Sequence, residues 1–155
     1  MRSPPAFVYY SGMSKPDYPV TTAIRELRQN QVDFIPRPYD YEEHGGTSRA
    51  ASCLGVDEHT VIKTLVFESG PREQFLVLMH GDREVSTKEL ARVLGVKRVE
   101  PATEATAERL TGYKVGGISP FGTRTRLKVY VEAGILELEL IRINGGKRGF
   151  LVELC

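Results

Sequence analysis

The spacing of apolar residues predicts several short helices separated by extended segments. Apolar positions three and four apart, preceded by Ser or Thr and followed by Gly, are typical of capped amphipathic helices. Ser86 and Glu89, for example, form a capping box, and Gly95 follows the last apolar position of that segment. Four helices are expected, over residues 22–29 with Thr21 or Thr22 as cap, from Thr47 or Ser48 to Gly55, over 86–94 and over 103–110.

Runs of β-branched and aromatic residues predict the strands. Residues 61–67 and 74–79 flank a Gly-Pro turn and form a predicted hairpin. The prolines of residues 34–39 place that extended segment at a sheet edge. Further strands are expected over residues 97–100, 127–131, 138–143 and 150–154. Because helices and strands mix without regular β–α–β alternation, we expect an α+β fold with a mixed or antiparallel, strongly curved sheet.

Length and composition fit one globular domain with room for a core. The chain has 155 residues, of which 41% are apolar and 26% charged. Four of its nine prolines lie in residues 1–19, which we expect to form a flexible leader before a domain over residues 20–155. No apolar run approaches the roughly 18 residues that a membrane span needs, and the start lacks a signal-peptide pattern. We therefore expect a cytoplasmic protein without a membrane partner.

Lys63 is an unusual residue within an apolar strand. Alternation puts it on one face with Val61, Leu65 and Phe67. Lysine is almost never fully buried unless it is paired. One interpretation is a lysine at the start of the strand that extends its ammonium to solvent. The other is a cation directed into a pocket, where it holds a phosphate or a polarised carbonyl.

Two glycine-rich segments with basic residues follow, over residues 111–126 and 144–149. Glycine at such density is typical of backbone that turns sharply or approaches a ligand closely, and its bare N–H groups can bind an oxygen-rich ligand. Residues 111–149 carry seven Lys or Arg against three Glu, although the net charge of the chain is only +1. Two such segments close in sequence favour one pocket. A simple connection and a solvated basic face are the alternatives.

The chain shows no motif for a protein nucleophile or a metal. It has no G-x-S-x-G, no H-E-x-x-H and no C-x-x-C, and its three histidines are scattered. We expect two free thiols, at Cys53 and Cys155, in a reducing compartment. Tyr39, Tyr41 and Tyr113 lie beside turns, where each either stacks on a base or packs at the rim of the sheet. A hydrolase built on this chain would rely on positioning and backbone electrostatics.

Three motifs occur in order along the chain: V-I-K-T-L-V, T-G-Y-K-V-G-G-I-S-P-F-G and N-G-G-K-R-G. Together they closely resemble the YbaK type of aminoacyl-tRNA deacylase, a relative of the editing domain in bacterial prolyl-tRNA synthetases, over residues 18–153. The resemblance implies an α+β fold with a curved, barrel-like mixed sheet flanked by short helices. It also implies hydrolysis of the ester bond of mischarged tRNA, typically tRNA for proline carrying cysteine or alanine, with no metal or organic cofactor.

The resemblance also implies roles for individual residues. Lys63 corresponds to the family's key lysine, which is expected to engage a phosphate of the terminal adenosine or the ester region, and Thr64 is a pocket residue beside it. Gly116 and Gly117 are expected to bind near the scissile carbonyl through their backbone, and Tyr39 matches a pocket tyrosine. The remaining substrate-binding residues are expected from the two glycine segments: Tyr113, Ile118, Ser119, Pro120, Asn144, Gly145, Lys147 and Arg148.

Two positions depart from the family pattern. The family commonly has serine where this chain has Asn144, and commonly has aspartate where this chain has Leu151. We expect both changes to affect amino-acid selection or activity more than the fold. They make a module that binds a tRNA 3′ end or a nucleotide without hydrolysis an alternative to the enzyme. A role beside an aminoacyl-tRNA synthetase is a third possibility.

Overall fold

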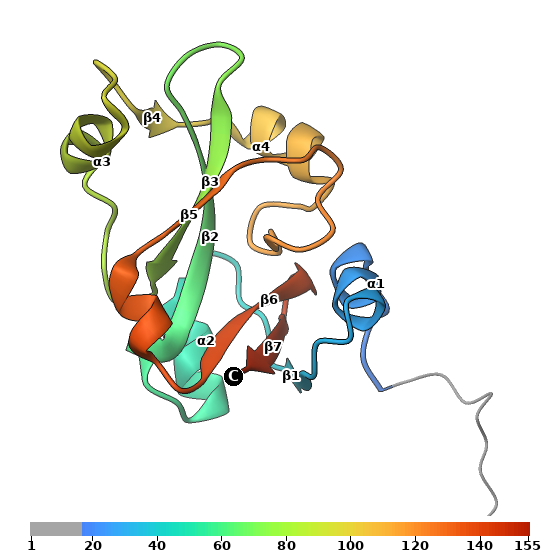
Figure 1. Cartoon of the computed structure of the whole chain (residues 1–155). Helices are drawn as coiled ribbons and strands as arrows, with labels where there is room; N and C mark the ends of the chain where they lie inside the picture. The colour runs from blue at the N-terminus through green and yellow to red at the C-terminus, as the bar shows by residue number, and fades with distance from the viewer. Residues whose placement is uncertain (1–16) are drawn as a thin grey trace, which may run out of the picture.

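The computed structural model describes residues 17–155, so residues 1–16 of the expected leader over residues 1–19 lie outside the described residues. The described part contains four short α-helices, two 3-10 helices and seven strands (Figure 1). The helices are α1 (Thr22–Gln29), α2 (Gly46–Leu54), η1 (Glu58–Thr60), α3 (Thr87–Leu94), α4 (Glu104–Thr111) and η2 (Ala133–Glu137). The strands are β1 (Ile35–Pro38), β2 (Val61–Glu68), β3 (Gln74–His80), β4 (Glu100–Pro101), β5 (Val129–Val131), β6 (Ile141–Lys147) and β7 (Phe150–Leu154).

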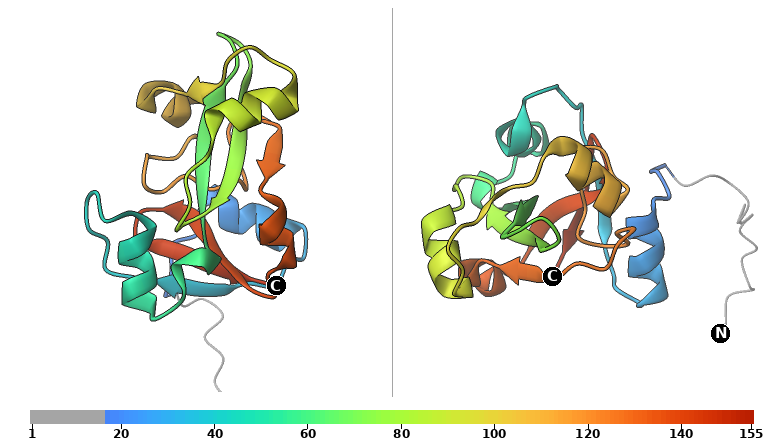
Figure 2. Two further views of the ribbon diagram at one scale, coloured as in Figure 1. Left: turned by 90° about the vertical axis from the view of Figure 1, so that its left-hand side faces the viewer. Right: turned by 90° about the horizontal axis from the view of Figure 1, so that it is seen from above.

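The seven strands form one open sheet. Its order is β1-β7-β6-β2-β3-β5, and β4 pairs with β2 beside this path. β2 runs parallel to β6 and β3 runs parallel to β5, whereas the other neighbours are antiparallel. β2 and β3 cross the β6–β7 pair steeply, which curves the sheet (Figures 1 and 2). The expected α+β fold with a curved mixed sheet is confirmed, and β1 and β5 leave the sheet open at its two ends.

The two faces of β2 pack against different helices. Val61 packs against α2 and Phe67 against α3. Ile62 packs against α1 and Val66 against α4. Adjacent residues in the middle of β2 therefore face two different sides of the sheet.

The helix boundaries follow the capping signals, with one exception. Three N-cap side chains accept a hydrogen bond from a backbone N–H three residues further on: Thr21 for α1, Ser86 for α3 and Thr103 for α4. α2 instead begins at Gly46 without a side-chain cap, which corrects the expected start at Thr47 or Ser48. The Thr47 hydroxyl is engaged elsewhere, because it donates to Glu58 at 2.9 Å.

Three strands differ from the expectation. β4 is limited to Glu100–Pro101 because only these two residues pair with the end of β2. β5 begins later than expected, at Val129. β6 also begins later and continues through most of the second glycine segment, with an irregularity between Asn144 and Lys147. That segment is therefore the end of a hairpin and not a separate loop.

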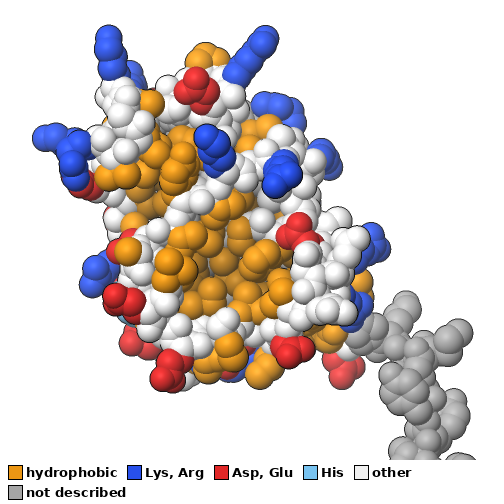
Figure 3. Space-filling view, viewed as in Figure 1, with side chains coloured by type: hydrophobic (Ala, Val, Ile, Leu, Met, Phe, Trp, Pro, Cys, Tyr) orange, Lys and Arg blue, Asp and Glu red, His pale blue; other side chains and the backbone are white. Residues whose placement is uncertain are grey.

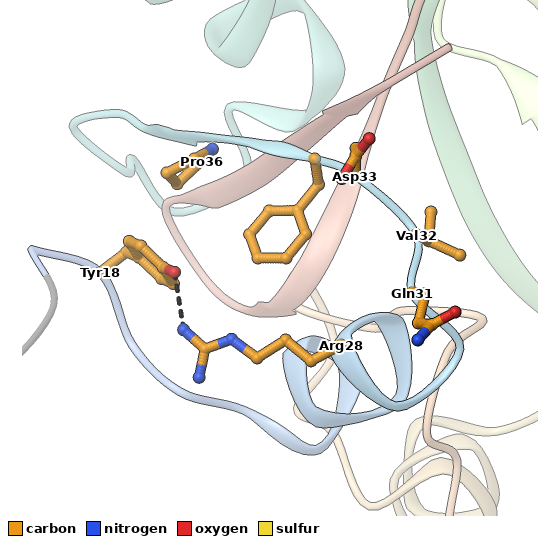
Figure 4. A pocket seen from close by; sticks show the side chains of 7 residues that line it. Tyr18, Arg28, Gln31, Val32, Asp33 and Pro36 are labelled. Carbon is orange, nitrogen blue, oxygen red and sulfur yellow. Dashed lines mark hydrogen bonds between the residues drawn. The ribbon is translucent and has the colours of Figure 1, made fainter.

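Tyr18 packs onto the core, although it falls within the residues expected to form the leader. Its ring stacks on Phe150 with centroids 5.9 Å apart and meets Phe34 edge-on at 6.0 Å. Arg28 donates to the Tyr18 hydroxyl at 2.7 Å, and these side chains help to line a surface hollow of about 560 Å³ between α1 and β1 (Figure 4). Val32 lies at this hollow with 41% of its surface exposed.

A buried polar network closes one end of the β2–β3 hairpin. His80 is only 1% exposed; its Nδ1 donates to the carbonyl oxygen of His59, and its Nε2 lies 2.8 Å from Oε2 of Glu132. The His59 ring stacks on His80 with centroids 3.7 Å apart, and its hydrogen bond to Asp82 lowers the pKa of that carboxyl. Glu132 also accepts from the N–H of Gly134. Both ring nitrogens of His80 thus have partners within the protein.

Candidate active site

The edge of β2 is open in its middle. β6 pairs with β2 only at Val61 and Ile62, and β4 pairs with it only at Phe67 and Glu68. Residues 63–66 therefore have no neighbouring strand on this edge. Backbone N–H and C=O groups inside a sheet are normally paired, so the gap is an unusual feature of a central strand.

Thr64 is the residue whose backbone groups face this gap. The N–H of Gly81 donates to the carbonyl of Val61 at 2.7 Å, so the odd-numbered residues of β2 direct their backbone groups toward β3. The even-numbered residues point the other way, as Val66 shows, because its carbonyl accepts from the N–H of Ala102 at 3.0 Å. The N–H and C=O of Thr64 therefore meet neither β6 nor β4.

A cavity of about 740 Å³ surrounds this gap. Its walls come from β2, the β1–α2 segment, the start of α4, the glycine loop after α4 and the β6–β7 hairpin. The two glycine segments meet here, as the single-pocket interpretation predicts. Seven of the expected site residues line the cavity: Tyr39, Lys63, Thr64, Gly116, Ile118, Asn144 and Arg148.

Lys63 lines the cavity, and 18% of its side chain is exposed. Its Nζ is 3.2 Å from Oε1 of Glu84, whose side chain is 95% exposed. An ion pair with so exposed a carboxylate is weak because water screens it. Lys63 thus both reaches solvent and lines the cavity, and its ammonium is available to an anionic ligand.

Thr64 carries a buried polar atom that is not paired. Its Oγ1 is buried and has no hydrogen-bond partner among the described residues. Leaving a buried hydroxyl unpaired costs about 1–3 kcal/mol. Within residues 17–155 this condition is shared only by Nε of Arg142, whose guanidinium is bound through Nη1 to Thr60 at 2.9 Å.

The two central glycines of the glycine loop have different surroundings. Gly116 lines the cavity, and neither its N–H nor that of Ile118 has a partner among the described residues. The N–H of Gly117 donates to the carbonyl of Lys114 at 2.8 Å, and a Cβ there would lie 2.7 Å from the backbone nitrogen of Arg148. Gly117 thus lets the loop pack on the hairpin, and of these neighbouring N–H groups those of Gly116 and Ile118 have no partner among the described residues.

Asn144 ties the two glycine segments together. Its Nδ2 donates to the carbonyl of Gly116 at 3.2 Å, and its Oδ1 accepts from the N–H groups of Gly146 and Lys147 at 2.7 and 3.1 Å. Across the β6–β7 pair Asn144 stands directly opposite Leu151. The two departures from the family pattern are therefore cross-strand neighbours, and both line the cavity.

Two tyrosines close the cavity on the side of the β1–α2 segment. Tyr39 donates its N–H to the carbonyl of Gly149 at 2.9 Å, and burial raises the pKa of its phenol. Arg148 donates through Nε to the carbonyl of Val115 at 2.8 Å, and its guanidinium lies 5.6 Å from the centroid of the Tyr41 ring. These contacts fix an arginine at the rim beside an aromatic surface.

The other expected site residues do not line the cavity. Tyr113 is 6% exposed, and its hydroxyl contacts the carbonyl of Phe121 and the hydroxyl of Thr22. Burial raises the pKa of the Tyr113 phenol. The idea that Tyr113 stacks on a base is therefore wrong in this structure, since its ring packs in the core. The residues outside the lining also include Gly117, Ser119, Pro120, Gly145 and Lys147.

Several lining residues were not singled out from the sequence. Thr47 lies in α2, Glu84 in the connection after β3 and Pro101 in β4. None carries a local pattern that marks it, because long-range strand pairing brings these segments together. Tyr41 was considered only as one of three turn tyrosines.

The comparisons with known proteins identify the family of the chain. Residues 42–154 match the model of the aminoacyl-tRNA editing domain family. This chain belongs to that family. It is an aminoacyl-tRNA deacylase by family, and aminoacyl-tRNA is its substrate.

Individual relatives support the same assignment. A protein of Enterococcus faecalis, provisionally named Cys-tRNA(Pro)/Cys-tRNA(Cys) deacylase EbsC, is 30% identical over 138 residues, which are 87% of this chain and 83% of that protein. The proline–tRNA ligase of Desulforamulus reducens is 36% identical over 126 residues, 81% of this chain but 21% of that enzyme. A solved structure described as a candidate trans-editing enzyme for prolyl-tRNA synthetase shares the fold, with a TM-score of 0.73 and 23% identity over 88% of this chain and 87% of that one.

Other kinds of site are not found in the part of the chain that the structure describes. Residues 17–155 contain no group of three or more His, Cys, Asp or Glu side chains placed to hold a metal. None of their helices is long and apolar enough to cross a membrane.

Proposed function

We propose that this deacylase edits in trans, hydrolysing the ester bond that joins a small non-cognate amino acid, most favourably cysteine, to tRNA(Pro). The observation that carries the proposal is Lys63, a weakly paired cation in the lining of a cavity on the open edge of β2. The name of the Enterococcus faecalis relative supports cysteine and tRNA(Pro) as the substrate. We place the activity in residues 20–155 and in the cytoplasm, and the two exposed, free cysteines fit a reducing compartment.

Lys63 and the glycine loop bind different groups of the substrate. The ammonium of Lys63 binds a phosphate of the terminal adenosine or the ester region, because it is a weakly paired, partly exposed cation in the cavity lining. The unpaired N–H groups of Gly116 and Ile118 donate to the scissile carbonyl as negative charge develops on its oxygen. Such donors stabilise the transition state without reorganisation. The group that assists attack on the ester comes from the substrate itself, either the 2′-hydroxyl of the tRNA or the thiol of a cysteinyl amino acid, so no protein nucleophile is required.

Charge on the surface fits a tRNA partner. Figure 3 shows more of the Lys and Arg side chains on the upper part of the face that it draws and more of the Asp and Glu side chains on the lower part, with both kinds present in each. Arg148 adds a fixed guanidinium at the cavity rim. The net charge of the chain is only +1, so its binding of tRNA is modest and salt-dependent. A synthetase partner would supply the further affinity for tRNA.

Amino-acid selection rests on the apolar wall. Val61, Leu65 and Leu151 line the cavity, and Leu151 is 4% exposed. An apolar pocket distinguishes substrates that differ by one methylene by only about 1–3 kcal/mol. Selection among cysteine, alanine and serine is therefore expected to be partial, and selection against larger side chains stronger.

A deacylation panel tests the proposal. The purified protein is offered tRNA(Pro) charged with cysteine, alanine, serine or proline, beside Lys63→Ala and a matched control, Lys97→Ala, whose exposed lysine lies outside the cavity. We expect fastest loss of cysteine, a decrease of about a hundredfold or more in Lys63→Ala, and no change in Lys97→Ala. Equal activity of the two lysine variants contradicts the site.

The same panel tests the alternative of a binding module. Leu151 and Asn144, which depart from the family pattern within the cavity wall, are the observation that favours it. That alternative predicts no hydrolysis of any charged tRNA, together with binding that weakens steeply as salt rises.

A further inference from the structure

The sheet has two open edges, and prolines block only one of them. At the β1 edge the N–H of Tyr39 donates to the carbonyl of Gly149 at 2.9 Å, so in the register of β1 with β7 the positions of Pro36 and Pro38 face away from the sheet. Proline has no N–H to donate. The β1 edge therefore presents no backbone donor to a further strand.

The β5 edge, in contrast, presents free donors and acceptors. The carbonyl of Lys128 accepts from an N–H of β3 at 2.8 Å, and the N–H of Glu132 donates to a carbonyl of β3 at 3.1 Å. The even-numbered residues of this segment thus bond to β3, and the backbone groups of Val129 and Val131 face outward. Because β5 ends the sheet, these two N–H and two C=O groups have no neighbouring strand among the described residues.

The side chains of β5 also favour a further strand. Val129 and Val131 are 42% and 38% exposed, and they lie on the same face of the sheet. Exposed β-branched side chains beside unpaired backbone are typical of a strand that another chain can extend. A lysine on the edge commonly prevents such pairing, and Lys128 occupies this position. A strand that binds here must therefore match the charge of Lys128.

The charges around β5 match those of a second copy of the same chain. Cations precede and enter the strand at Arg124, Arg126 and Lys128, and anions follow it at Glu132 and Glu137. In an antiparallel pair of identical strands, the segment before β5 in one copy lies beside the segment after β5 in the other. Cations then meet anions at both ends of the pair, whereas a parallel pair places like charges side by side.

We propose that two copies of the chain associate through β5, antiparallel about a two-fold axis at Tyr130, so that their sheets join into one. In this register Val129 of each copy stands opposite Val131 of the other and exchanges both backbone hydrogen bonds with it. The pairing uses all four outward groups of each copy. It also brings the four valine side chains together on one face of the joined sheet.

Lys128 of each copy stands opposite Glu132 of the other in the same register. Oε2 of Glu132 lies 2.8 Å from Nε2 of His80 and accepts from the N–H of Gly134, whereas its Oε1 has no partner among the described residues. Opposite charges directly across a strand pair stabilise it, and two-fold symmetry makes the contact occur twice. None of the residues of β5 lines the cavity, so this inference is independent of the proposed function.

Sedimentation of the full-length chain at increasing concentration tests the proposal. The pairing surface is small, so we expect a weak dimer, with the 17.3 kDa mass of one chain at about 1 μM and twice that mass as the concentration approaches about 1 mM. Val131→Pro removes an outward N–H that the sheet does not use, and it should abolish the dimer. Lys128→Glu places like charges opposite each other twice, and it should raise the dissociation constant about tenfold.

Lys97→Glu is the matched control, because this exposed lysine precedes β4, which pairs with β2 and not with β5. It should leave the dissociation constant unchanged. Unfolding curves check that each variant is folded. If Val131→Pro does not fold, the exposed substitution Lys128→Glu carries the test against its control.

Amide exchange with deuterated solvent locates the contact. The amides of Val129 and Val131 should exchange rapidly in dilute solution and slowly at the concentration where the dimer forms. A chain that sediments as a monomer up to about 1 mM overturns the inference. So does a dimer in which these two amides remain fast, or one that Lys128→Glu weakens no more than Lys97→Glu, because such a dimer uses another surface.

Discussion

The hydroxyl of Thr64 and the ring of His80 are buried polar groups on the same hairpin, and their surroundings are opposite. Both ring nitrogens of His80 meet acceptors supplied by His59 and Glu132, whereas the hydroxyl of Thr64 has no partner among the described residues. A satisfied buried polar group stabilises a fold, and an unsatisfied one destabilises it. The comparison indicates that one end of the hairpin is built for stability and the middle of β2 for a ligand.

The largest effect on stability is expected from substituting His80, at the end of the hairpin where the buried polar groups are hydrogen-bonded. His80→Ala removes a fully buried ring and leaves the carboxylate of Glu132 and the carbonyl of His59 without their partner, so it should lower the free energy of unfolding by about 2–4 kcal/mol. Denaturant unfolding measures this loss. His44→Ala is the control, because the side chain of His44 is 92% exposed.

Deacylation by His80→Ala should stay close to the wild-type rate at temperatures where the variant is folded. A loss of activity without a loss of stability would contradict the division between a structural and a functional end of the hairpin.

A smaller effect is expected where the glycine loop meets the hairpin. Gly117→Ala places a Cβ 2.7 Å from the backbone nitrogen of Arg148 and 2.9 Å from the carbonyl carbon of Lys147, neither of which can move without shifting the hairpin. Such crowding costs about 1–3 kcal/mol of unfolding free energy. Gly70→Ala is the matched control, since its Cβ meets nothing nearer than 3.9 Å.

The smallest expected change is an increase in the free energy of unfolding. Thr64→Val replaces an unpaired buried hydroxyl with a methyl group of similar shape, so it should raise the free energy of unfolding by about 1 kcal/mol. Thr111→Val is the control, because the buried hydroxyl of Thr111 donates to the carbonyl of Ala107 at 2.7 Å and its loss should destabilise. If both valine variants destabilise equally, the hydroxyl of Thr64 has a hydrogen-bond partner after all, and the comparison with His80 fails.

The sequence predicts much of the fold because its signals are local. Ser86 and Thr103 cap helices that begin at the next residue, and the apolar run of β2 forms a strand where expected. The short β4 and the late start of β6 were missed because each depends on a distant pairing partner, and no local pattern marks where that pairing stops.

The site residues also differ in whether a local sequence signal or a long-range contact determines their position. Lys63 is recognisable because a cation interrupts an apolar face within one strand. Tyr113 was misassigned because its direction depends on Thr22, which lies 91 positions away in the chain. Thr64 was expected from the family resemblance, but its unpaired hydroxyl and open backbone edge depend on where β6 and β4 end, which only the folded structure gives.

The open edge of β2 also has a consequence for the exchange of backbone protons with deuterated solvent. The N–H groups of Lys63 and Leu65 face β3 in the register of a paired hairpin, whereas that of Thr64 faces the gap. Exchange is slow for amides bonded inside a sheet and fast for those that are not. A single rapidly exchanging amide should therefore lie between two slow ones in the centre of the sheet, and its slowing on addition of an aminoacyl ligand would report occupancy of the cavity directly.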